Sequence, residues 1–209
     1  MYTIHKTTYN ITTTKEINPT KICFISDVHY PNANNPQRLK KITNTLMKVK
    51  PDFYLLGKDF VNESTSKYDM GILFKQLKRL TKVALVYFVY GNHENKIKFT
   101  KNNITILNDQ EVHLNNIILI GRKDYKKKRK KTKDYNLTNK TYNIILDHQP
   151  QGTKENIKNN VDLNSAAILI TVKCFHSLIL TIYNLTLPVI TEKKHSCTTQ
   201  KIISSGLVD

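Results

Sequence analysis

The chain has 209 residues, of which 39% are hydrophobic and 23% are charged, so it is long enough for one well-packed domain and short for two. These proportions are ordinary for globular proteins and exclude an intrinsically disordered chain. The formal net charge of +17 indicates attraction to anionic molecules, such as nucleic acid, lipid surfaces or phosphorylated substrates, but selects none of them.

The positive charge comes mainly from lysine, with 29 Lys and 4 Arg beside 22 Asn and 23 Ile. Lys, Asn and Ile have AT-rich codons, so the base composition of the genome explains much of the charge. Surfaces that bind phosphate groups usually draw on Arg, whose guanidinium binds phosphate through two hydrogen bonds. The low Arg content therefore favours base composition, and we do not expect nucleic acid as a dedicated partner.

The three cysteines, Cys23, Cys174 and Cys197, have neither paired nor metal-ligand spacing, which favours a reducing compartment. The first residues, MYTIHKTTYNITTTKE, lack the apolar core of a signal peptide. We therefore expect a cytoplasmic location.

Apolar runs alternate with helical patterns along the first half of the chain. Strands are predicted at Lys21–Ser26, Phe53–Gly57 and Ala84–Gly91, and amphipathic helices at Pro36–Lys50 and Tyr68–Leu80. Shorter strands are predicted at 104–107, 117–121 and 142–147. This order predicts a layered α/β fold with at least one largely parallel sheet.

Four of the predicted strands run directly into polar residues at their carboxyl ends. These residues are Asp27 and His29, then Asp59, then Asn92 and His93, and finally Asp147 and His148. A single Asp or His after a strand is more often a turn former. Four successive strand ends that combine carboxylate, carboxamide and imidazole are hard to explain in that way. Because ligands bind at the carboxyl ends of strands in open α/β sheets, we expect these side chains to converge on one crevice that holds Mn, Fe or Zn.

The sequence D-x-H, then G-x-D, then GNHE, then a His after a strand resembles the calcineurin-like metallophosphoesterase family. The segments FISDVHY, PDFYLLGKDFVN, VYGNHE, ILIGRKDY and LDHQP resemble its bacterial branch that acts near membranes. The resemblance covers about residues 20–163. It implies a layered sandwich of two mixed β-sheets flanked by helices, with residues 1–163 as the core and residues 164–209 as an atypical C-terminal segment of the same domain.

The resemblance also implies a site with two divalent metal ions, of the kind formed by Mn, Fe or Zn. Asp27 and His29 would bind the first ion, Asp59 would bridge both ions, and Asn92 and His148 would bind the second. Within these motifs the chain departs from the family at Lys58, where the family has Gly before the bridging Asp. A Lys would crowd that turn if the position needs positive φ.

The implied activity is hydrolysis of phosphate mono- or diester, or pyrophosphate, bonds by a hydroxide that the two ions activate. His93 would contact the phosphate and protonate the leaving oxygen. Lipid and nucleotide-sugar headgroups are candidate substrates. The alternative is an inactive remnant of the fold that binds anionic partners through its basic surface.

Lys123–Lys133 (KDYKKKRKKTK) is a dense basic run between two predicted strands. It is either a solvated surface loop or a docking patch in which Lys126–Lys133 contact an anionic membrane surface. The second explanation would place the protein at the inner face of the membrane.

The family closes its site with a GHxH motif, which would follow a strand soon after residue 163, but the chain contains no such motif. The expected region instead holds the apolar stretch Ala166–Leu187, whose length approaches that of a membrane-spanning helix but which Lys173, His176 and Asn184 interrupt. Buried strands are a second explanation, and a change of reading frame is a third.

Synonymous codons for Asn164–His176 can be chosen so that the same bases, read in a frame shifted by one position, encode Leu-Ser-Gly-His-Thr-His-Asn-Gly-Gln-Met-Phe-Pro. The protein sequence permits this match without requiring it. Our hypothesis is that residues from about 164 to about 200 are translated out of the ancestral frame. Each metal would then lack one imidazole, which would weaken metal binding strongly.

Overall fold

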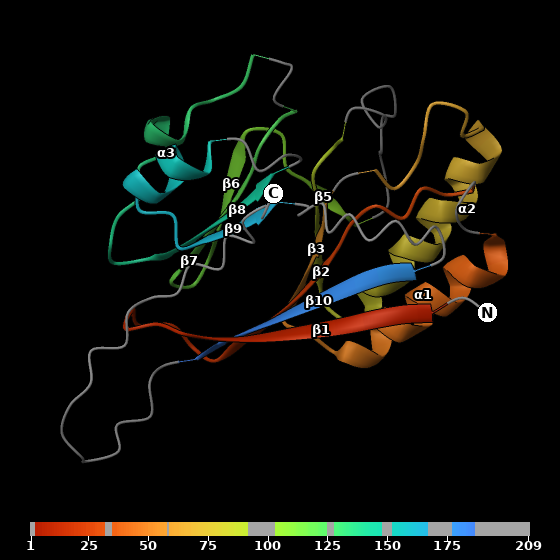
Figure 1. Cartoon of the computed structure of the whole chain (residues 1–209), viewed down its shortest axis with the longest axis horizontal. Coiled ribbons are helices and arrows are strands. Elements are labelled where there is room, and N and C mark those ends of the chain that lie inside the picture. The colour runs from red at the N-terminus through yellow and green to blue at the C-terminus, as the bar shows by residue number, and fades with distance from the viewer. Residues whose placement is uncertain are drawn as a thin grey trace, which may run out of the picture.

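The computed structural model of the chain describes residues 3–31, 35–57, 59–91, 103–124, 128–147, 152–166 and 177–186. Two β-sheets form its centre, and helices pack on their outer sides (Figure 1). Strands that run parallel and antiparallel to their neighbours occur in both sheets. The predicted α/β fold with two mixed sheets is therefore confirmed.

The first sheet has six strands in the order β1-β10-β2-β3-β4-β5. Strands β2, β3, β4 and β5 run parallel to one another, as the alternation of strands and helices predicted, and β10 is antiparallel to β2. The carboxyl ends of β2, β3 and β4 therefore lie at one edge of this sheet. The bounds are β1 Thr3–Thr12, β2 Thr20–Ile25, β3 Phe53–Leu56, β4 Leu85–Phe88, β5 Thr105–Ile106 and β10 Ser177–Thr186.

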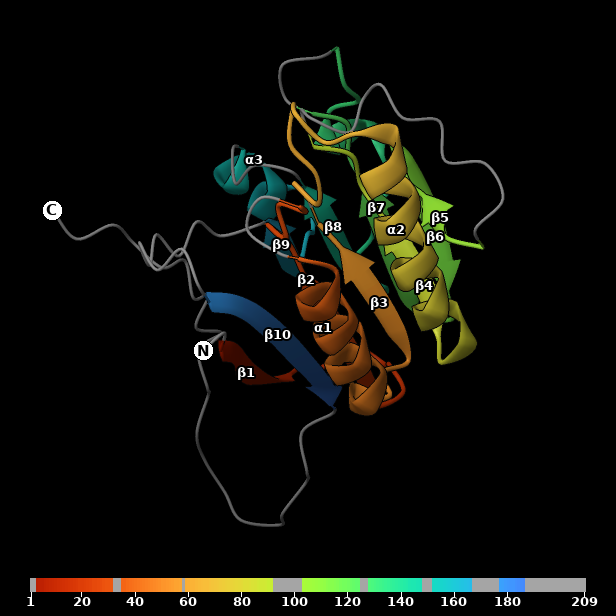
Figure 2. The same ribbon diagram turned by 90° about the vertical axis from the view of Figure 1, so that its right-hand side faces the viewer.

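Helices α1 (Pro36–Val49) and α2 (Lys67–Leu77), the second continued by the 3-10 helix η1 (Lys78–Lys82), cover the outer face of this sheet (Figure 2). Each α-helix begins at a side-chain cap: Asn35 Oδ1 accepts from the Arg38 N–H at 2.8 Å, and Ser66 Oγ accepts from the Asp69 N–H at 3.1 Å. The apolar residues at helical spacing face the sheet and are buried; they include Leu39, Ile42 and Leu46 of α1 and Leu73, Phe74 and Leu77 of α2.

The second sheet has the order β6-β7-β8-β9, with β6 antiparallel to β7 and the other pairs parallel. The strands are β6 Gln110–Leu114, β7 Ile117–Gly121, β8 Tyr142–Asp147 and β9 Leu163–Ala166. The 3-10 helix η3 (Thr132–Asp134) lies between β7 and β8 in the sequence, and helix α3 (Thr153–Lys158) lies between β8 and β9.

The two sheets pack face to face through one apolar layer. Phe24, Leu55 and Tyr87 from the first sheet form a buried cluster with Leu119 and Ile144 from the second. Burial on both faces explains why β3 and β7 are continuously apolar rather than alternating; β8 is also buried along its whole length, although it contains Asn143 and ends in Asp147.

Strands β1, β6, β9 and β10 and helix α3 were not predicted as defined elements. The apolar stretch Ala166–Leu187 is described only at 166 and 177–186, and the latter residues form β10, which lies between β1 and β2. In the described ranges no helix is long and apolar enough to cross a membrane. A strand therefore accounts for this part of the stretch, and the change of reading frame stays a prediction.

Candidate metal centre

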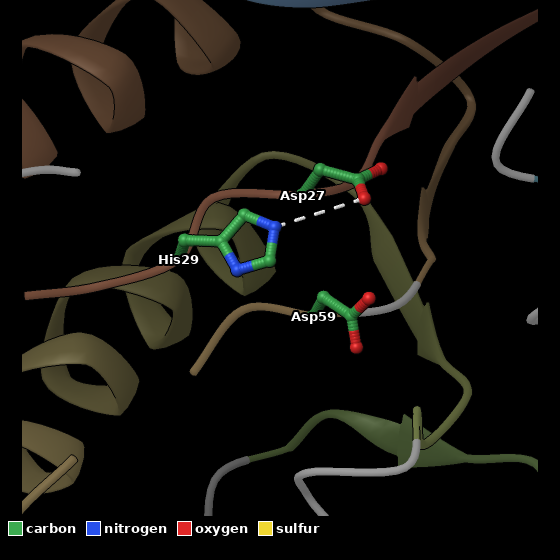
Figure 3. Close-up of side chains that lie close together, drawn as sticks. All are labelled: Asp27, His29 and Asp59. Carbon is green, nitrogen blue, oxygen red and sulfur yellow. Dashed lines mark ion pairs between the residues drawn. The ribbon is translucent and has the colours of Figure 1, made fainter. Parts of the chain in front are cut away.

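Asp27, His29 and Asp59 come together at the carboxyl edge of the first sheet. Asp27 and His29 follow β2, and Asp59 follows the neighbouring parallel strand β3. Each residue offers one ligand atom, and these atoms all lie within 4.8 Å of one another (Figure 3). Parallel pairing of β2 with β3 thus brings together residues about thirty positions apart in the sequence, as predicted from the strand-end pattern.

All three residues have left-handed backbone conformations, with φ of 57° at Asp27, 48° at His29 and 53° at Asp59. Such values are uncommon outside glycine, although Asp and His adopt them more often than most residues. Each costs about 1–2 kcal/mol for an L-residue, and strain of this kind concentrates at functional sites. The conformation aims three polar side chains at one point (Figure 3).

The donor set fits a divalent ion. Asp59 is 8% exposed, whereas the side chains of Asp27 and His29 are 39% and 41% exposed, so the cluster has one buried wall and one side open to solvent. His29 Nε2 lies 3.9 Å from Asp27 Oδ1, close enough for one ion to contact both residues. Carboxylate oxygens together with imidazole nitrogen suit Mn, Fe and Zn.

The backbone joins the two loops that carry these residues. The N–H of His29 donates to the carbonyl of Asp59 at 2.9 Å, and the N–H of Tyr30 donates to the carbonyl of Phe60 at 2.8 Å. Tyr30 then pairs with Val61 in a parallel bridge. The two strands therefore continue as a short ladder past their ends, which fixes the spacing of the loops.

Tyr30, next to His29, is fully buried. Burial raises its pKa, and the negative charge of Asp69 adds to the effect. Its phenol therefore remains protonated at neutral pH, and its side chain packs in the core cluster that includes residues of α1 and α2.

The other predicted site residues, Asn92, His93 and His148, lie outside the described residues, as does Lys58. Gly91, which directly precedes Asn92, is buried after β4, which pairs with β3 in the same sheet. Strand β8, which leads to His148, belongs to the second sheet. The four strand ends therefore come from two sheets, and the roles of these residues remain proposals.

Asp147, at the end of β8, was grouped with the strand-end residues but lies in a different environment. Its carboxylate is fully buried and forms ion pairs with Arg122 and Arg129; Arg129 Nη1 lies 3.0 Å from Oδ1. The second Nη atom of the Arg122 guanidinium also bonds to Asp147. Asp147 is thus a structural anion at the end of β8.

Sequence reasoning missed the rest of this buried network. Arg122 Nη1 donates to Thr132 Oγ1 at 2.8 Å, and Thr132 Oγ1 donates to Asn156 Oδ1 at 2.6 Å. The network connects β7, η3 and α3 behind the end of β8. An isolated Arg directly after an apolar strand was the available signal.

The basic run Lys123–Lys133 is anchored to the second sheet where the structure describes it. Asp109 accepts hydrogen bonds from the backbone N–H groups of Lys123 and Lys130, and Lys130 Nζ lies 4.1 Å from the centre of the Tyr135 ring. Arg129 points inward to Asp147. Exposed cations of the run include Lys128, Lys131 and Lys133. The described part of the run is therefore a surface segment with exposed lysines that is anchored through Asp109 and Asp147.

Comparison with known proteins shows which family the chain resembles. The sequence model of the family described as calcineurin-like phosphoesterase matches residues 20–188. An uncharacterized metallophosphoesterase of Helicobacter pylori is 29% identical over 202 residues, a match that covers 89% of this chain and 54% of that protein. The chain thus spans about half the length of this curated relative.

Proposed function

Because the chain belongs to the calcineurin-like phosphoesterase family, we propose that it is a metal-dependent hydrolase of phosphate mono- or diester, or pyrophosphate, bonds. The observation that carries this proposal is the cluster of Asp27, His29 and Asp59, whose ligand atoms lie within 4.8 Å of one another. It combines the oxygen and nitrogen donors that a catalytic divalent ion requires.

In the proposed site, Asp27 and His29 would hold one ion, and Asp59, on the loop after β3, would be shared with a second. Asn92 and His148 would complete the set of ligands for the second ion. Bound divalent ions supply an acidified water and the positive charge that phosphoryl transfer needs. Mn, Fe and Zn all suit this set of donors.

His93 is the proposed proton donor to the leaving oxygen. The half-exposed side chains of Asp27 and His29 leave the site open to a phosphoester on one side. The net charge of +17 attracts such anions from solution. Lipid or nucleotide-sugar headgroups are the proposed substrates, and the exposed lysines of the basic run would contact an anionic membrane surface at its inner face.

A second candidate is an inactive remnant of the fold that binds anionic partners. The absence of a GHxH motif from the sequence favours it, because each metal would lack one imidazole ligand. The two candidates differ in metal-dependent turnover and not in anion binding.

The test is hydrolysis of bis(p-nitrophenyl) phosphate by the purified chain across a manganese titration. An enzyme gives turnover that rises with Mn²⁺, disappears with EDTA and is abolished by Asp59→Asn. Asp52→Asn is the matched control, because Asp52 precedes β3 at the opposite end of the strand and bonds to the Lys21 N–H. Absence of turnover at every Mn²⁺ concentration would favour the remnant.

A further inference from the structure

Thr65 lies near the end of the segment that joins β3 to α2, and its side chain contacts the loop after β2. It is 8% exposed, and its hydroxyl donates to the backbone carbonyl of Tyr30 at 2.9 Å, with Asn62 Oδ1 as a second, more distant acceptor at 3.1 Å. The same oxygen accepts from the backbone N–H of Asn62 at 2.9 Å. One hydroxyl thus bonds to the loop after β2 and to the loop after β3.

The position of this hydroxyl extends the ladder described above. Tyr30 donates its N–H to the carbonyl of Phe60. In a regular parallel pair of strands, the next hydrogen bond would run from the N–H of Asn62 to the carbonyl of Tyr30. The Thr65 hydroxyl bridges these two groups, because it accepts from the N–H of Asn62 and donates to the carbonyl of Tyr30. The role requires a side chain that both donates and accepts hydrogen bonds.

Two features fix Thr65 itself. Its N–H donates to the carbonyl of Asn62 at 3.1 Å, which closes a turn, and Asn62 Oδ1 accepts from the N–H and hydroxyl of Ser64 at 3.1 and 2.8 Å. The next residue, Ser66, caps α2, whose buried face packs on the first sheet. The hydroxyl is therefore held by a turn on one side and by a packed helix on the other.

The left-handed backbone conformations of Asp27, His29 and Asp59 need support from the surrounding structure, and the Thr65 hydroxyl supplies part of it. Strained residues keep their conformation only where the surrounding structure over-determines them. We propose that Thr65 is a positioning residue of the metal centre, whose hydroxyl holds the two ligand loops in register so that their side chains stay at metal-binding distance. This inference rests on the proposed function.

The experiment compares Mn²⁺ binding by isothermal titration calorimetry in variants of the full chain, at a temperature at which all are folded. Thr65→Val keeps the shape and removes the hydroxyl, and we expect its Kd to rise about ten-fold or more, the usual effect of losing a group that supports metal ligands. Thr65→Ser keeps the hydroxyl, and its Kd should stay within about two-fold of the wild type.

Thr43→Val is the control for a general loss of stability. Thr43 is fully buried in α1, and its hydroxyl donates to the carbonyl of Leu39 at 3.0 Å, in the same helix. Its replacement should lower Tm and leave the Kd for Mn²⁺ unchanged. Hydrogen exchange of the His29 and Tyr30 amides should accelerate in Thr65→Val and not in Thr43→Val.

If Thr65→Val does not fold, Thr65→Cys replaces it, because a thiol fills the space but forms weak hydrogen bonds; it should bind Mn²⁺ more weakly than Thr65→Ser. An unchanged Kd in Thr65→Val, or an equal loss in Thr65→Ser, would overturn the inference and leave the proposed function standing. Failure of the wild-type chain to bind Mn²⁺ would overturn both.

Discussion

The backbone N–H of His29 donates a hydrogen bond to the carbonyl of Asp59 at 2.9 Å, so two proposed metal ligands are joined through the main chain. The bond forms just past the ends of β2 and β3, where both residues have positive φ. The spacing of the ligands is therefore a property of the fold. A site arranged in this way needs little reorganisation when a metal binds, which improves affinity.

We expect Asp59→Asn to separate metal binding from folding. Without metal, the variant should be at least as stable as the wild type, because it removes the repulsion between the neighbouring carboxylates of Asp27 and Asp59. The gain should not exceed about 1 kcal/mol, because solvent partly screens one of the two charges. Asn also tolerates the left-handed backbone of residue 59. The wild type should gain about 2.7 kcal/mol at Mn²⁺ concentrations one hundred times Kd, and the variant should gain far less.

Thermal unfolding with EDTA and with Mn²⁺ measures both effects, and Asp52→Asn serves again as the control carboxylate. A large loss of stability in metal-free Asp59→Asn would show that the carboxylate has a structural role instead.

The metal cluster was predictable because its signal is local: each residue directly follows an apolar strand, and the parallel order of the strands brings their ends together. Arg122 after β7 was a signal for a buried ion pair, but its partner was not predictable, because Asp147 occupies the same kind of strand-end position as Asp27. Sequence order does not distinguish a metal ligand from the partner of a buried arginine.

Asp147→Ala should be among the most destabilising single substitutions in the second sheet. It removes the carboxylate that forms ion pairs with the buried Arg122 and with Arg129, and removing one partner of a buried ion pair costs about 3–5 kcal/mol. Urea denaturation followed by circular dichroism measures the loss. Asp134→Ala, which removes an exposed carboxylate in η3, is the control and should cost about 1 kcal/mol through its capping bond to the Lys131 N–H.

The glycines Gly121 and Gly71 should respond in opposite ways to alanine. A Cβ at Gly121 would lie 2.1 Å from Leu107 Cβ, at the interface between the sheets, and overpacking of this kind costs about 1–3 kcal/mol. A Cβ at Gly71, inside α2, meets nothing within 4 Å, so Gly71→Ala should stabilise by roughly 0.5–1 kcal/mol through helix propensity. The free energy of unfolding of both variants, measured under one set of conditions, checks these expectations. A stabilising Gly121→Ala would contradict the close packing of the sheets at this position.

Three of the strands that escaped prediction, β1, β6 and β9, lie at the edges of their sheets, whereas β10 belongs to the apolar stretch for which buried strands were one explanation. Strand β1 has the sequence TIHKTTYNIT and lies at the edge of the first sheet, where the residues described alternate between exposed and half-buried. Strand β6 is also an edge strand with exposed charges. Edge strands lack the continuous apolar run that identified β3 and β7, because one or both of their faces meet water.

Because of Cys23, the stability of the fold should decrease as the pH rises through the alkaline range. Burial raises the pKa of its thiol from 9.0 to about 12, and the positive charge of Lys6 opposes this shift only in part. Below pH 9 the thiol is protonated in both the folded and the unfolded chain. Above pH 9 only the unfolded chain releases the proton, so stability should fall between pH 9 and 12, by roughly 1 kcal/mol per pH unit from this group.

Urea unfolding at pH 8.5, 9.5 and 10 under reducing conditions measures the slope, and Cys23→Ala should flatten it. Burial also raises the pKa values of Tyr54 and Tyr135, so these phenols add to the fall above pH 10. Equal slopes in the wild type and in Cys23→Ala would contradict the assignment to this thiol.

The hypothesis of a changed reading frame makes a prediction about the gene. The bases that encode residues 160–203 should regroup, by one position, into codons for Gly-His-x-His near residue 167. The family match extends to residue 188, and β10 completes the first sheet at Ser177–Thr186, so this segment contributes to the fold in its present form. Bases that cannot be regrouped into His-x-His would end the hypothesis.

A version of the chain recoded in the ancestral frame from residue 164 to about residue 200 tests the chemical consequence. Two added imidazoles would complete the set that Asp27, His29 and Asp59 begin, and we expect the Kd for Mn²⁺ to fall by about ten-fold or more, with turnover of a phosphodiester rising in parallel. A second recoded version with Ala at both new His positions is the control. Equal Mn²⁺ affinity of the two versions would show that the missing ligands are supplied elsewhere in the chain, because the frame and the segment length are the same in both.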